Sequence, residues 1–234
     1  MKVGISQPTF LSWQGYFALI DHVDIFVFLD TVQFVKRSWV QRNKIKINDK
    51  EHWLSIPIKS KNKGHQIIKE TKIDFDHLDK KKIIKSIYSN YKKAKNFENY
   101  FEMISKTILE CGENISDLNE TLIKKISEAL NLKTKFIKSS ELNCYNDYKN
   151  IELLKHICLE LSAKEYISTI GAKIYMGEKL NFDNTNIKIK FFDYKTTTYN
   201  QLGKVFVPYL SIIDLLFNEG ENSKKILKNS FNLL

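Results

Sequence analysis

The sequence is poor in the residues that interrupt regular structure. Its 234 residues include 8 Gly and 3 Pro, a share far below that of collagen-like, low-complexity or linker-dominated chains. A long apolar run is also missing. The longest, at residues 24–30, has its apolar residues enclosed by two aspartates and is far shorter than the roughly 20 residues that a membrane span needs. It predicts a buried strand instead.

Cysteine is scarce as well, with three residues at wide spacing. This pattern favours neither a disulfide framework nor a close-spaced zinc site, so we expect Cys111, Cys144 and Cys158 to be buried thiols. A catalytic pair of Cys158 with His156 stays open as an alternative. The five histidines show no metal-ligand spacing, and we expect no zinc site. The start of the chain has no signal-peptide core, so we expect a cytoplasmic protein.

The charge is positive and unevenly distributed. Lys and Arg number 37 against 27 Asp and Glu, a formal net charge of +10, which favours an anionic partner. Residues 41–100 hold 16 of the basic residues and 7 of the acidic ones. Ile83, Ile87 and Tyr91 recur at helical spacing, and the lysines around them are typical of a solvated helix face; these are Lys80, Lys81, Lys82, Lys85, Lys92 and Lys93. Nucleic-acid binding by this segment stays open, and it would show a steep salt dependence.

The apolar pattern predicts an α/β fold. With 43% apolar and 12% aromatic residues, the chain has ample material for a packed core. Residues 3–5 form a strand candidate, residues 15–23 a helix and residues 25–29 a second strand. Because the second strand is apolar on both faces and follows a helix, it indicates a parallel sheet covered on both sides.

The rest of the chain continues this alternation around a helical middle. Residues 44–58 alternate as a hairpin with a turn near residues 48–50, and residues 59–65, which are all polar, predict a mobile loop that an anionic ligand orders. Further strands are expected at 134–137, 165–169 and 187–192, and further helices at 151–161 and, from the N-cap Ser211 to near Gly220, at 212–220.

Residues 78–132 have helical periodicity in three consecutive segments, too long for a single crossover connection. The predicted fold is therefore a mostly parallel, Rossmann-like sheet with flanking helices. Residues 1–76 and 133–234 form its α/β core, and residues 77–132 form a helical subdomain or insertion.

The loop after the first strand is the first candidate site. In open α/β sheets, ligands bind beyond the carboxyl ends of the strands, where a helix N-terminus offers free amides. Gly15 allows a close backbone approach, Gln7 offers an amide, and Trp13 and Tyr16 have faces suited to stacking on a base or a sugar. Burial of the two rings at the helix start is the alternative. The glycine signatures of dinucleotide and P-loop sites are absent.

The segment that leaves the second strand is the second candidate. Asp30 is placed to hold a sugar hydroxyl or to act as a base, and Arg37 and Arg42 have forked donors suited to phosphate or carboxylate. Gln33 and Asn43 have side-chain amides that read amide or base edges. Since both strands end at the same edge, this segment should lie beside the first loop. A structural ion pair between Asp30 and Arg37 is the alternative.

Two groups of residues make the chain recognisable. The first consists of Ser6-Gln7-Pro8, Trp13, Gly15-Tyr16-Phe17, Asp24, Leu29-Asp30, Val32-Gln33-Phe34, Lys36-Arg37, Trp39 and Arg42-Asn43, and the second of Tyr199-Asn200-Gln201-Leu202 with Phe206-Val207-Pro208-Tyr209-Leu210-Ser211-Ile212-Ile213-Asp214-Leu215-Leu216-Phe217-Asn218-Glu219-Gly220. Together they resemble the WbqC-like protein family over nearly the whole chain.

This resemblance implies a biological context. Members occur in bacterial gene clusters for O-antigen and other surface polysaccharides, and in some natural-product clusters. Many carry His or Met where this chain has Ser6, which argues against catalysis at that position. The resemblance implies a shared site that includes Gln7, Asp30, Arg37, Arg42, Asn43, Asp214 and Asn218.

The leading hypothesis is a transferase that modifies a nucleotide-linked amino sugar, forming an amide with an acyl or aminoacyl donor during surface-glycan assembly. Asp30 and Asp214 are the candidate catalytic carboxylates. The candidate substrate-binding residues are Gln7, Trp13, Gly15, Tyr16, Gln33, Arg37, Arg42, Asn43, Tyr199, Gln201 and Asn218. The sequence assigns no cofactor and no oligomeric state.

Two other functions stay open. The loop at residues 13–16 lies where nucleotidylyltransferase-like folds carry a His-x-Gly-His motif, with Trp13 and Tyr16 replacing both histidines, and residues 168–171 lie where a late phosphate loop would. An enzyme of that type with a degenerate motif is the first alternative. The second is a non-catalytic RNA-binding protein that uses the lysine-rich middle.

Overall fold

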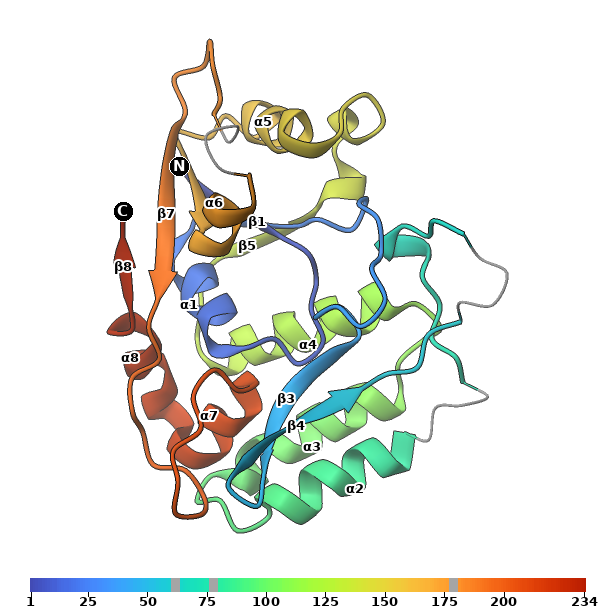
Figure 1. Ribbon diagram of the computed structural model, residues 1–234, viewed down its shortest axis with the longest axis vertical. Helices are drawn as coiled ribbons and strands as arrows, with labels where there is room; N and C mark the ends of the chain where they lie inside the picture. The colour runs from blue at the N-terminus through green and yellow to red at the C-terminus, as the bar shows by residue number, and fades with distance from the viewer. Residues whose placement is uncertain (60–63, 76–79, 177–180) are drawn as a thin grey trace.

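The structure is built on one mixed sheet. The computed structural model describes residues 1–59, 64–75, 80–176 and 181–234, with the backbone alone for residues 174–176. Its sheet has six strands in the order β5-β2-β1-β6-β7-β8 (Figure 1). The strands are β1 (Lys2–Ser6), β2 (Ile25–Phe28), β5 (Lys135–Lys138), β6 (Glu165–Thr169), β7 (Lys188–Tyr194) and β8 (Phe231–Leu233). The first five strands in this order, from β5 across to β7, run parallel to one another. The last, β8, pairs antiparallel with β7.

Helices flank this sheet and lie beside the segment that follows β2 (Figure 1). They are α1 (Gln14–His22), α2 (Lys80–Tyr91), α3 (Phe97–Leu109), α4 (Ile115–Ala129), α5 (Asn150–Glu160), α6 (Ile170–Met176), α7 (Ile212–Glu219) and α8 (Ser223–Lys228). Of these, α2 and α3 are the helices beside that segment. The prediction of a mostly parallel α/β sheet with flanking helices is confirmed. Within the described ranges, no helix is long and apolar enough to cross a membrane.

The central strands are apolar because both of their faces are covered. Phe26 and Phe28 belong to one apolar cluster, which includes residues of α1 and α4. Ile25 and Val27, which point to the opposite face, belong to a second cluster that includes residues of α5. Since every residue of β2 is buried, an alternating polar pattern would have left polar groups in the core.

The order of the strands creates a switch point beside β1. The chain passes from β1 through α1 to β2 on one side of β1, whereas β6 pairs with β1 on the other side. Neighbouring connections therefore leave in opposite directions and open a crevice beyond the ends of β1 and β6, at Ser6 and Thr169. Crevices of this kind are where open α/β sheets bind ligands.

A separate hairpin follows β2. It consists of β3 (Arg42–Ile47) and β4 (Lys50–Ser55), and its turn residues Asn48 and Asp49 both have positive φ, at 50° and 60°. This is the geometry of a two-residue hairpin turn, which asparagine and aspartate tolerate well. The predicted hairpin is confirmed. Helix α7 packs against both β3 and α3 and so joins the hairpin to the rest of the molecule.

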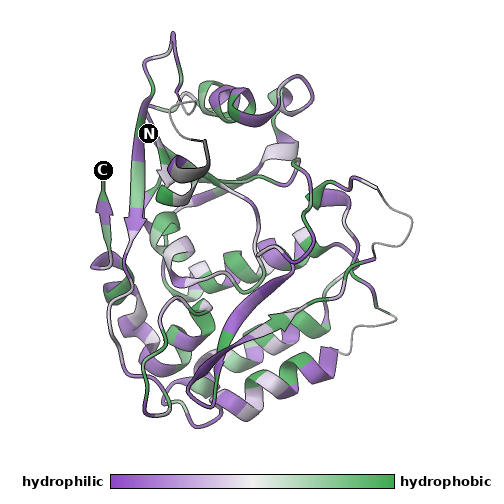
Figure 2. Ribbon diagram, viewed as in Figure 1, coloured by the Kyte–Doolittle hydropathy of each residue, from purple (hydrophilic) through white to green (hydrophobic). Residues whose placement is uncertain are grey.

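The three predicted helical segments are confirmed as α2, α3 and α4, although residues 77–79 of the predicted unit lie outside the described residues, as do residues 60–63 of the predicted loop. Apolar and polar residues alternate along α3 and α4 (Figure 2). Their apolar faces, with Ile104 and Ile123, join the same cluster as Phe26 and Phe28 of the sheet. A separately folding subdomain at residues 77–132 stays a prediction.

The chain ends in elements that were predicted in part. Ser211 is the N-cap of α7, and its Oγ accepts a hydrogen bond from the amide of Ile213 at 3.4 Å, as predicted. The cap of α7 at its other end is Gly220, with a φ of 57°. Helices α6 and α8 and strand β8 were not predicted, because each has at most seven residues and too few turns to show a clear period.

Candidate functional site

A cavity of about 480 Å³ lies beyond the carboxyl ends of β1, β6 and β7, at the switch point. Its lining residues are Ser6, Gln7, Thr9, Trp13, Gly15, Tyr16, Leu19, Ser38, Trp39, Thr169, Ile170, Gly171, Phe192, Tyr194 and Tyr209. They come from segments that are far apart in the sequence. Four of the predicted site residues, Gln7, Trp13, Gly15 and Tyr16, are among them.

Aromatic side chains form much of the cavity wall. The ring of Trp13 lies 5.2 Å from that of Tyr194 in an edge-to-face arrangement and 6.0 Å from that of Tyr209. Trp39 and Tyr209 are 45% and 49% exposed, so they lie at the mouth of the cavity. Aromatic walls of this kind suit a ligand with flat apolar faces, such as a nucleobase or a sugar ring.

The position of Trp13 depends on Gly15. A Cβ atom on Gly15 would lie 2.3 Å from the Cη2 atom of Trp13, so the indole rests directly on the first turn of α1. Trp13 is itself the N-cap residue of this helix, and no side chain caps it. The glycine therefore leaves room for the indole to rest against the helix. A close backbone approach to a ligand at Gly15 stays a prediction.

Tyr16 holds the loop that follows β1 by a hydrogen bond. Its hydroxyl donates to the carbonyl oxygen of Gln7 at 3.0 Å, and its ring packs 5.1 Å from that of Phe26. Burial, with a contribution from Glu120, raises the pKa of Tyr16 well above its usual value. The phenol therefore stays protonated at neutral pH and serves as a donor to the loop.

Asp30 is buried at the end of β2 and faces β5. One carboxylate oxygen accepts hydrogen bonds from the Ser139 hydroxyl at 2.8 Å and the Ser140 amide at 3.0 Å, and the other accepts from the Ser140 hydroxyl at 2.6 Å. Asp30 is not among the residues that line the cavity. In the described part of the chain its carboxylate makes no ion pair with the guanidinium of Arg37, so the predicted alternative of a structural ion pair is wrong. The carboxylate thus fastens the ends of two neighbouring strands.

Asn43 joins the hairpin to the loop of the cavity. Its buried amide nitrogen donates to the carbonyl oxygens of Phe10 at 3.1 Å and Leu11 at 3.0 Å, and its amide oxygen accepts from the backbone of Lys44 at 2.8 Å. All of these partners belong to the protein. Asn43 therefore holds the loop in place instead of facing the cavity.

The remaining residues of the second predicted stretch lie at the surface. Arg37 is exposed and has a positive φ of 59°. The amide of Gln33 lies 2.6 Å from the His65 ring. The guanidinium of Arg42 stacks 4.1 Å above the ring of Trp53 on the hairpin. These three side chains are not among those that line the cavity.

A buried polar network surrounds Asp214 at the start of α7. Its carboxylate accepts hydrogen bonds from the hydroxyls of Tyr199 at 2.6 Å and Tyr91 at 3.0 Å and from the amide of Gln201 at 2.9 Å. Burial raises the pKa of Asp214, and these three donors oppose the shift. Asn218 belongs to the same region, since its amide donates to the backbone oxygen of Asp214 at 2.7 Å.

Gln14 connects this network to the cavity wall. Its amide nitrogen donates to the Tyr199 hydroxyl at 2.6 Å, and its amide oxygen accepts from the Tyr194 hydroxyl at 3.2 Å. Tyr194 lines the cavity. The predicted residues Tyr199, Gln201 and Asp214 are therefore brought together with one another, behind the cavity wall and not in the cavity.

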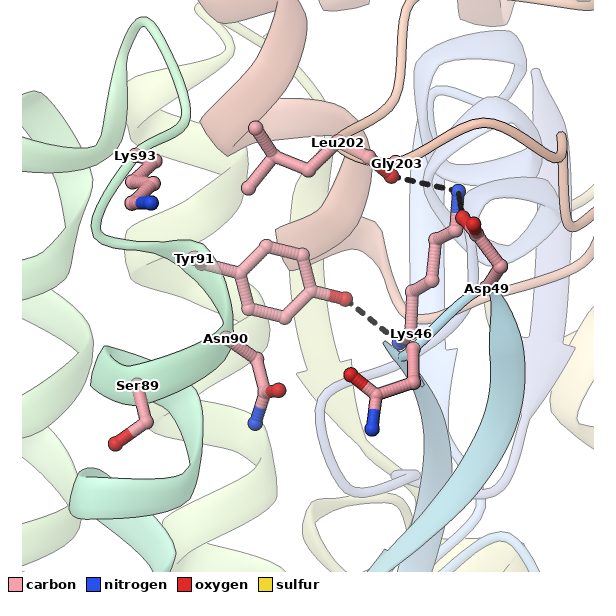
Figure 3. A pocket seen from close by; sticks show the side chains of 9 residues that line it. Lys46, Asp49, Ser89, Asn90, Tyr91, Lys93, Leu202 and Gly203 are labelled. Carbon is pink, nitrogen blue, oxygen red and sulfur yellow. Dashed lines mark hydrogen bonds and ion pairs between the residues drawn. The ribbon is translucent and has the colours of Figure 1, made fainter.

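A second cavity, of about 410 Å³, lies between the tip of the hairpin and the end of α2 (Figure 3). The ammonium of Lys46 donates to the carbonyl oxygens of Leu202, at 2.6 Å, and Val205, and lies 3.1 Å from the Asp49 carboxylate. Asp49 in turn accepts from the amide of Lys204 at 3.0 Å. The charges of this pair thus hold the segment at 202–205 against the hairpin.

Sequence reasoning missed several residues of the strand-end cavity. Trp39 lies within the second predicted stretch, and its aromatic ring was a signal that could have identified it. Tyr194 and Tyr209 come from β7 and from the segment before α7, and no local pattern links either to β1. Residues 169–171 line the cavity; they belong to the segment predicted to lie where nucleotidylyltransferase-like folds have a late phosphate loop.

Two cysteines are buried, as expected. Burial raises the pKa of Cys144 to about 11 and that of Cys158 to about 12. Both belong to the apolar cluster under α5, whereas Cys111 is partly exposed. The ring of His156 stacks on Tyr148 at a centroid distance of 3.4 Å. A protonated buried thiol is a poor nucleophile, so this arrangement does not favour a catalytic cysteine.

Comparison with known proteins agrees with the two terminal motifs. The chain matches the WbqC-like protein family over residues 7–226. It is 34% identical over 229 residues to the uncharacterized protein Rv1507c of Mycobacterium tuberculosis, an alignment that covers 97% of each chain. No solved structure matches it. The chain therefore belongs to the WbqC-like protein family.

Proposed function

We propose that the protein is a transferase that joins an acyl or aminoacyl group to a nucleotide-linked amino sugar, in the assembly of a surface polysaccharide. The observation that carries the proposal is the aromatic-walled cavity of about 480 Å³ at the switch point of the sheet. Its volume is within the range typical of small-molecule sites. The association of the family with polysaccharide biosynthesis genes supports the choice of substrate.

The lining of the cavity suits a sugar nucleotide. Trp13, Tyr194 and Tyr209 offer aromatic faces for a sugar or a base, and the side chains of Ser6, Thr9 and Thr169 offer hydroxyls. Such hydroxyls donate and accept hydrogen bonds, as the hydroxyls of a sugar do. Arg37, whose neighbour Ser38 lines the cavity, is an exposed cation near the mouth.

In this proposal the two predicted catalytic carboxylates are hydrogen-bonded to other segments of the protein. Amide formation requires a base to remove a proton from the attacking amine. Asp30 and Asp214 are both buried and already accept three hydrogen bonds each. These contacts favour a positioning role, in which Asp30 fixes the strand ends and Asp214 fixes the segment that leads to Tyr209. Their catalytic role stays a prediction.

The proposal is tested by thermal shift with nucleoside diphosphate amino sugars, followed by turnover with candidate acyl donors. A ligand that binds only the folded protein raises its Tm. We expect Trp13→Ala to abolish the shift and Tyr88→Ala, an exposed ring on α2, to retain it. Failure of every amino-sugar nucleotide to raise the Tm would contradict the proposal. Unchanged turnover in both Asp30→Asn and Arg42→Ala would overturn the assignment of those residues.

Nucleotidyl transfer is the second candidate. The observation that favours it is that Trp13 and Tyr16 line the same cavity as Thr169 and Gly171, the segments that would carry the two phosphate-binding motifs. The histidines that stabilise the transferred phosphate are replaced, which weighs against efficient catalysis. Release of pyrophosphate from a nucleoside triphosphate in the presence of a sugar phosphate would support this candidate over amide formation.

A further inference from the structure

Two tryptophans lie side by side on the surface next to the strand-end cavity. Trp53 on β4 and Trp39 are each 45% exposed, and their ring centroids are 5.1 Å apart. Trp39 also lines the cavity, so the pair extends the aromatic wall outward onto the hairpin. Because an indole leaves a large apolar face in water, an adjacent exposed pair is typical of a binding surface.

Two cations from the neighbouring strand lie over the ring of Trp53. Arg42 and Lys44 point to the same face of β3, since they are two residues apart. The Arg42 guanidinium lies 4.1 Å and the Lys44 ammonium 5.3 Å from the ring centre of Trp53. Lys44 is paired with Glu51 at 2.7 Å. Arg42 has no ion-pair partner within the described ranges, so its charge is available to a ligand.

Arg42 also has an unused donor. Its Nε atom is buried and has no hydrogen-bond partner in the described part of the chain. Buried donors in native proteins nearly always have a partner, so this Nε–H calls for an acceptor. The terminal nitrogens of the same guanidinium carry further donors. The forked guanidinium suits the oxygens of a phosphate, to which it donates two parallel hydrogen bonds.

We propose that Trp39, Trp53 and Arg42 form a second binding site, for the nucleotide part of an activated acyl donor. The base stacks on the exposed indole faces, as bases do on aromatic side chains in other proteins, and Arg42 binds the phosphate. Trp39 belongs to both sites, so it directs the acyl end of the donor toward the cavity. This inference rests on the proposed function and names the class of its second substrate.

The chemistry balances with such a donor. The amine nitrogen of the sugar forms a bond to the acyl carbonyl carbon, and the bond from that carbon to the phosphate oxygen or thioester sulfur of the donor breaks. The electron pair leaves with the nucleotide-bearing group, and the amine proton passes to solvent. No oxidant or reductant is required.

The test measures binding of AMP and coenzyme A to the full-length protein by calorimetry. AMP represents acyl adenylates and coenzyme A represents thioesters, so the tighter of the two identifies the donor. Adenosine and inorganic phosphate serve as single-component probes. We expect Trp53→Ala to weaken nucleotide binding at least tenfold, and Arg42→Lys to weaken it for the nucleotides but not for adenosine.

Matched variants separate binding from folding. Tyr88 on α2 is 44% exposed and has the Lys92 ammonium 5.5 Å from its ring centre, so Tyr88→Ala removes an equivalent ring elsewhere. It should leave nucleotide affinity unchanged, and Trp53→Phe should restore most of it. Equal affinity in the native protein and Trp53→Ala, or no binding of either nucleotide, would overturn the inference.

The two proposals fail separately. The inference on the donor site predicts that Trp53→Ala keeps the thermal shift with amino-sugar nucleotides. If the protein binds AMP or coenzyme A through Trp53 but binds no amino-sugar nucleotide, the site at the hairpin is supported and the proposed function is contradicted. If it binds amino-sugar nucleotides but neither AMP nor coenzyme A, the proposed function is supported and the inference on the donor site is contradicted.

Discussion

Single buried side chains carry much of the organisation around the cavity. Asp30, Asn43 and Asp214 each lie at the junction of two segments, and each has its polar atoms occupied by partners within the protein. Satisfied polar groups of this kind specify one arrangement of the backbone, because any other arrangement leaves a buried donor or acceptor unpaired. Buried polar residues can therefore fix the backbone around a cavity without lining it.

Asp214 gives the sharpest test of this role. We expect Asp214→Ala to lower the free energy of unfolding by about 2–4 kcal/mol, because the donors of Tyr91, Tyr199 and Gln201 lose their common acceptor. Urea unfolding measures the change. Asp193→Asn, at a partly exposed carboxylate 3.8 Å from Lys195, is the control and should cost under about 1 kcal/mol. Equal effects would refute the role of the network.

Sequence reasoning located residues along the chain better than it located their side chains in space. It placed Asp30 correctly after the second strand, yet the partners of its carboxylate are Ser139 and Ser140, more than 100 positions away. Nothing local to β2 tells which neighbour its last side chain faces. The same holds for Tyr194 and Tyr209, which reach the cavity only through the tertiary fold.

At the scale of elements, α1 is the part on which the cavity depends most. Its first turn supports the indole of Trp13, and its side chains join both the apolar cluster and the polar network. The strands were predictable because their apolar pattern reflects burial on both faces. The short final elements were not, since their positions depend on packing against α1 and β7.

Gly15→Ala tests the support of Trp13 by this helix. The new methyl group would overlap the indole, so we expect a loss of about 1–3 kcal/mol in the free energy of unfolding, or a displaced ring with altered tryptophan fluorescence. Gly112 has open space around its Cα atom, so Gly112→Ala should change stability by less than about 0.5 kcal/mol. A fully stable Gly15→Ala with native fluorescence would disprove the contact.

The end of α1 predicts a pH dependence. Burial, together with the nearby Lys2 ammonium, lowers the pKa of His22 below its usual 6.5. Between that lowered pKa and 6.5, the unfolded chain binds more protons than the folded one, so stability rises with pH in this window. Urea unfolding at several pH values from about 4 to 8 should show this rise, and His22→Gln should flatten it.

The exposed His52 supplies the control for that measurement. His52→Gln should keep the pH dependence of the native protein. A native curve that stays flat through this window, or one that falls as the pH rises, would contradict the assignment to His22.

At the scale of the whole molecule, the apolar core is shared. Ile104 of α3 and Ile123 of α4 belong to the same cluster as Phe26 of β2 and Phe217 of α7. Because the helices of the middle segment and the sheet bury their faces against each other, neither leaves a complete core when the other unfolds. We therefore expect cooperative unfolding of the chain as one unit.

The tryptophans make this expectation measurable. The 3 Trp of the sequence, Trp13, Trp39 and Trp53, all lie near the cavity, whereas α2, α3 and α4 contribute much of the helical circular dichroism. Urea unfolding curves followed by tryptophan fluorescence and by far-ultraviolet circular dichroism should coincide within error. A separate dichroism transition would instead favour the predicted helical subdomain at residues 77–132.

The hydrogen-bonded line from Tyr194 through Gln14 and Tyr199 to Asp214 also bears on how the protein is made. Gln14 and Tyr199 are 185 positions apart, so their contact closes a loop that comprises most of the chain. A contact of such long range requires both ends of the chain to be present, and closing the loop costs conformational entropy. During synthesis the wall of the strand-end cavity therefore stays incomplete until Tyr209, which lines it, and Asp214, which ends the hydrogen-bonded line, have been made.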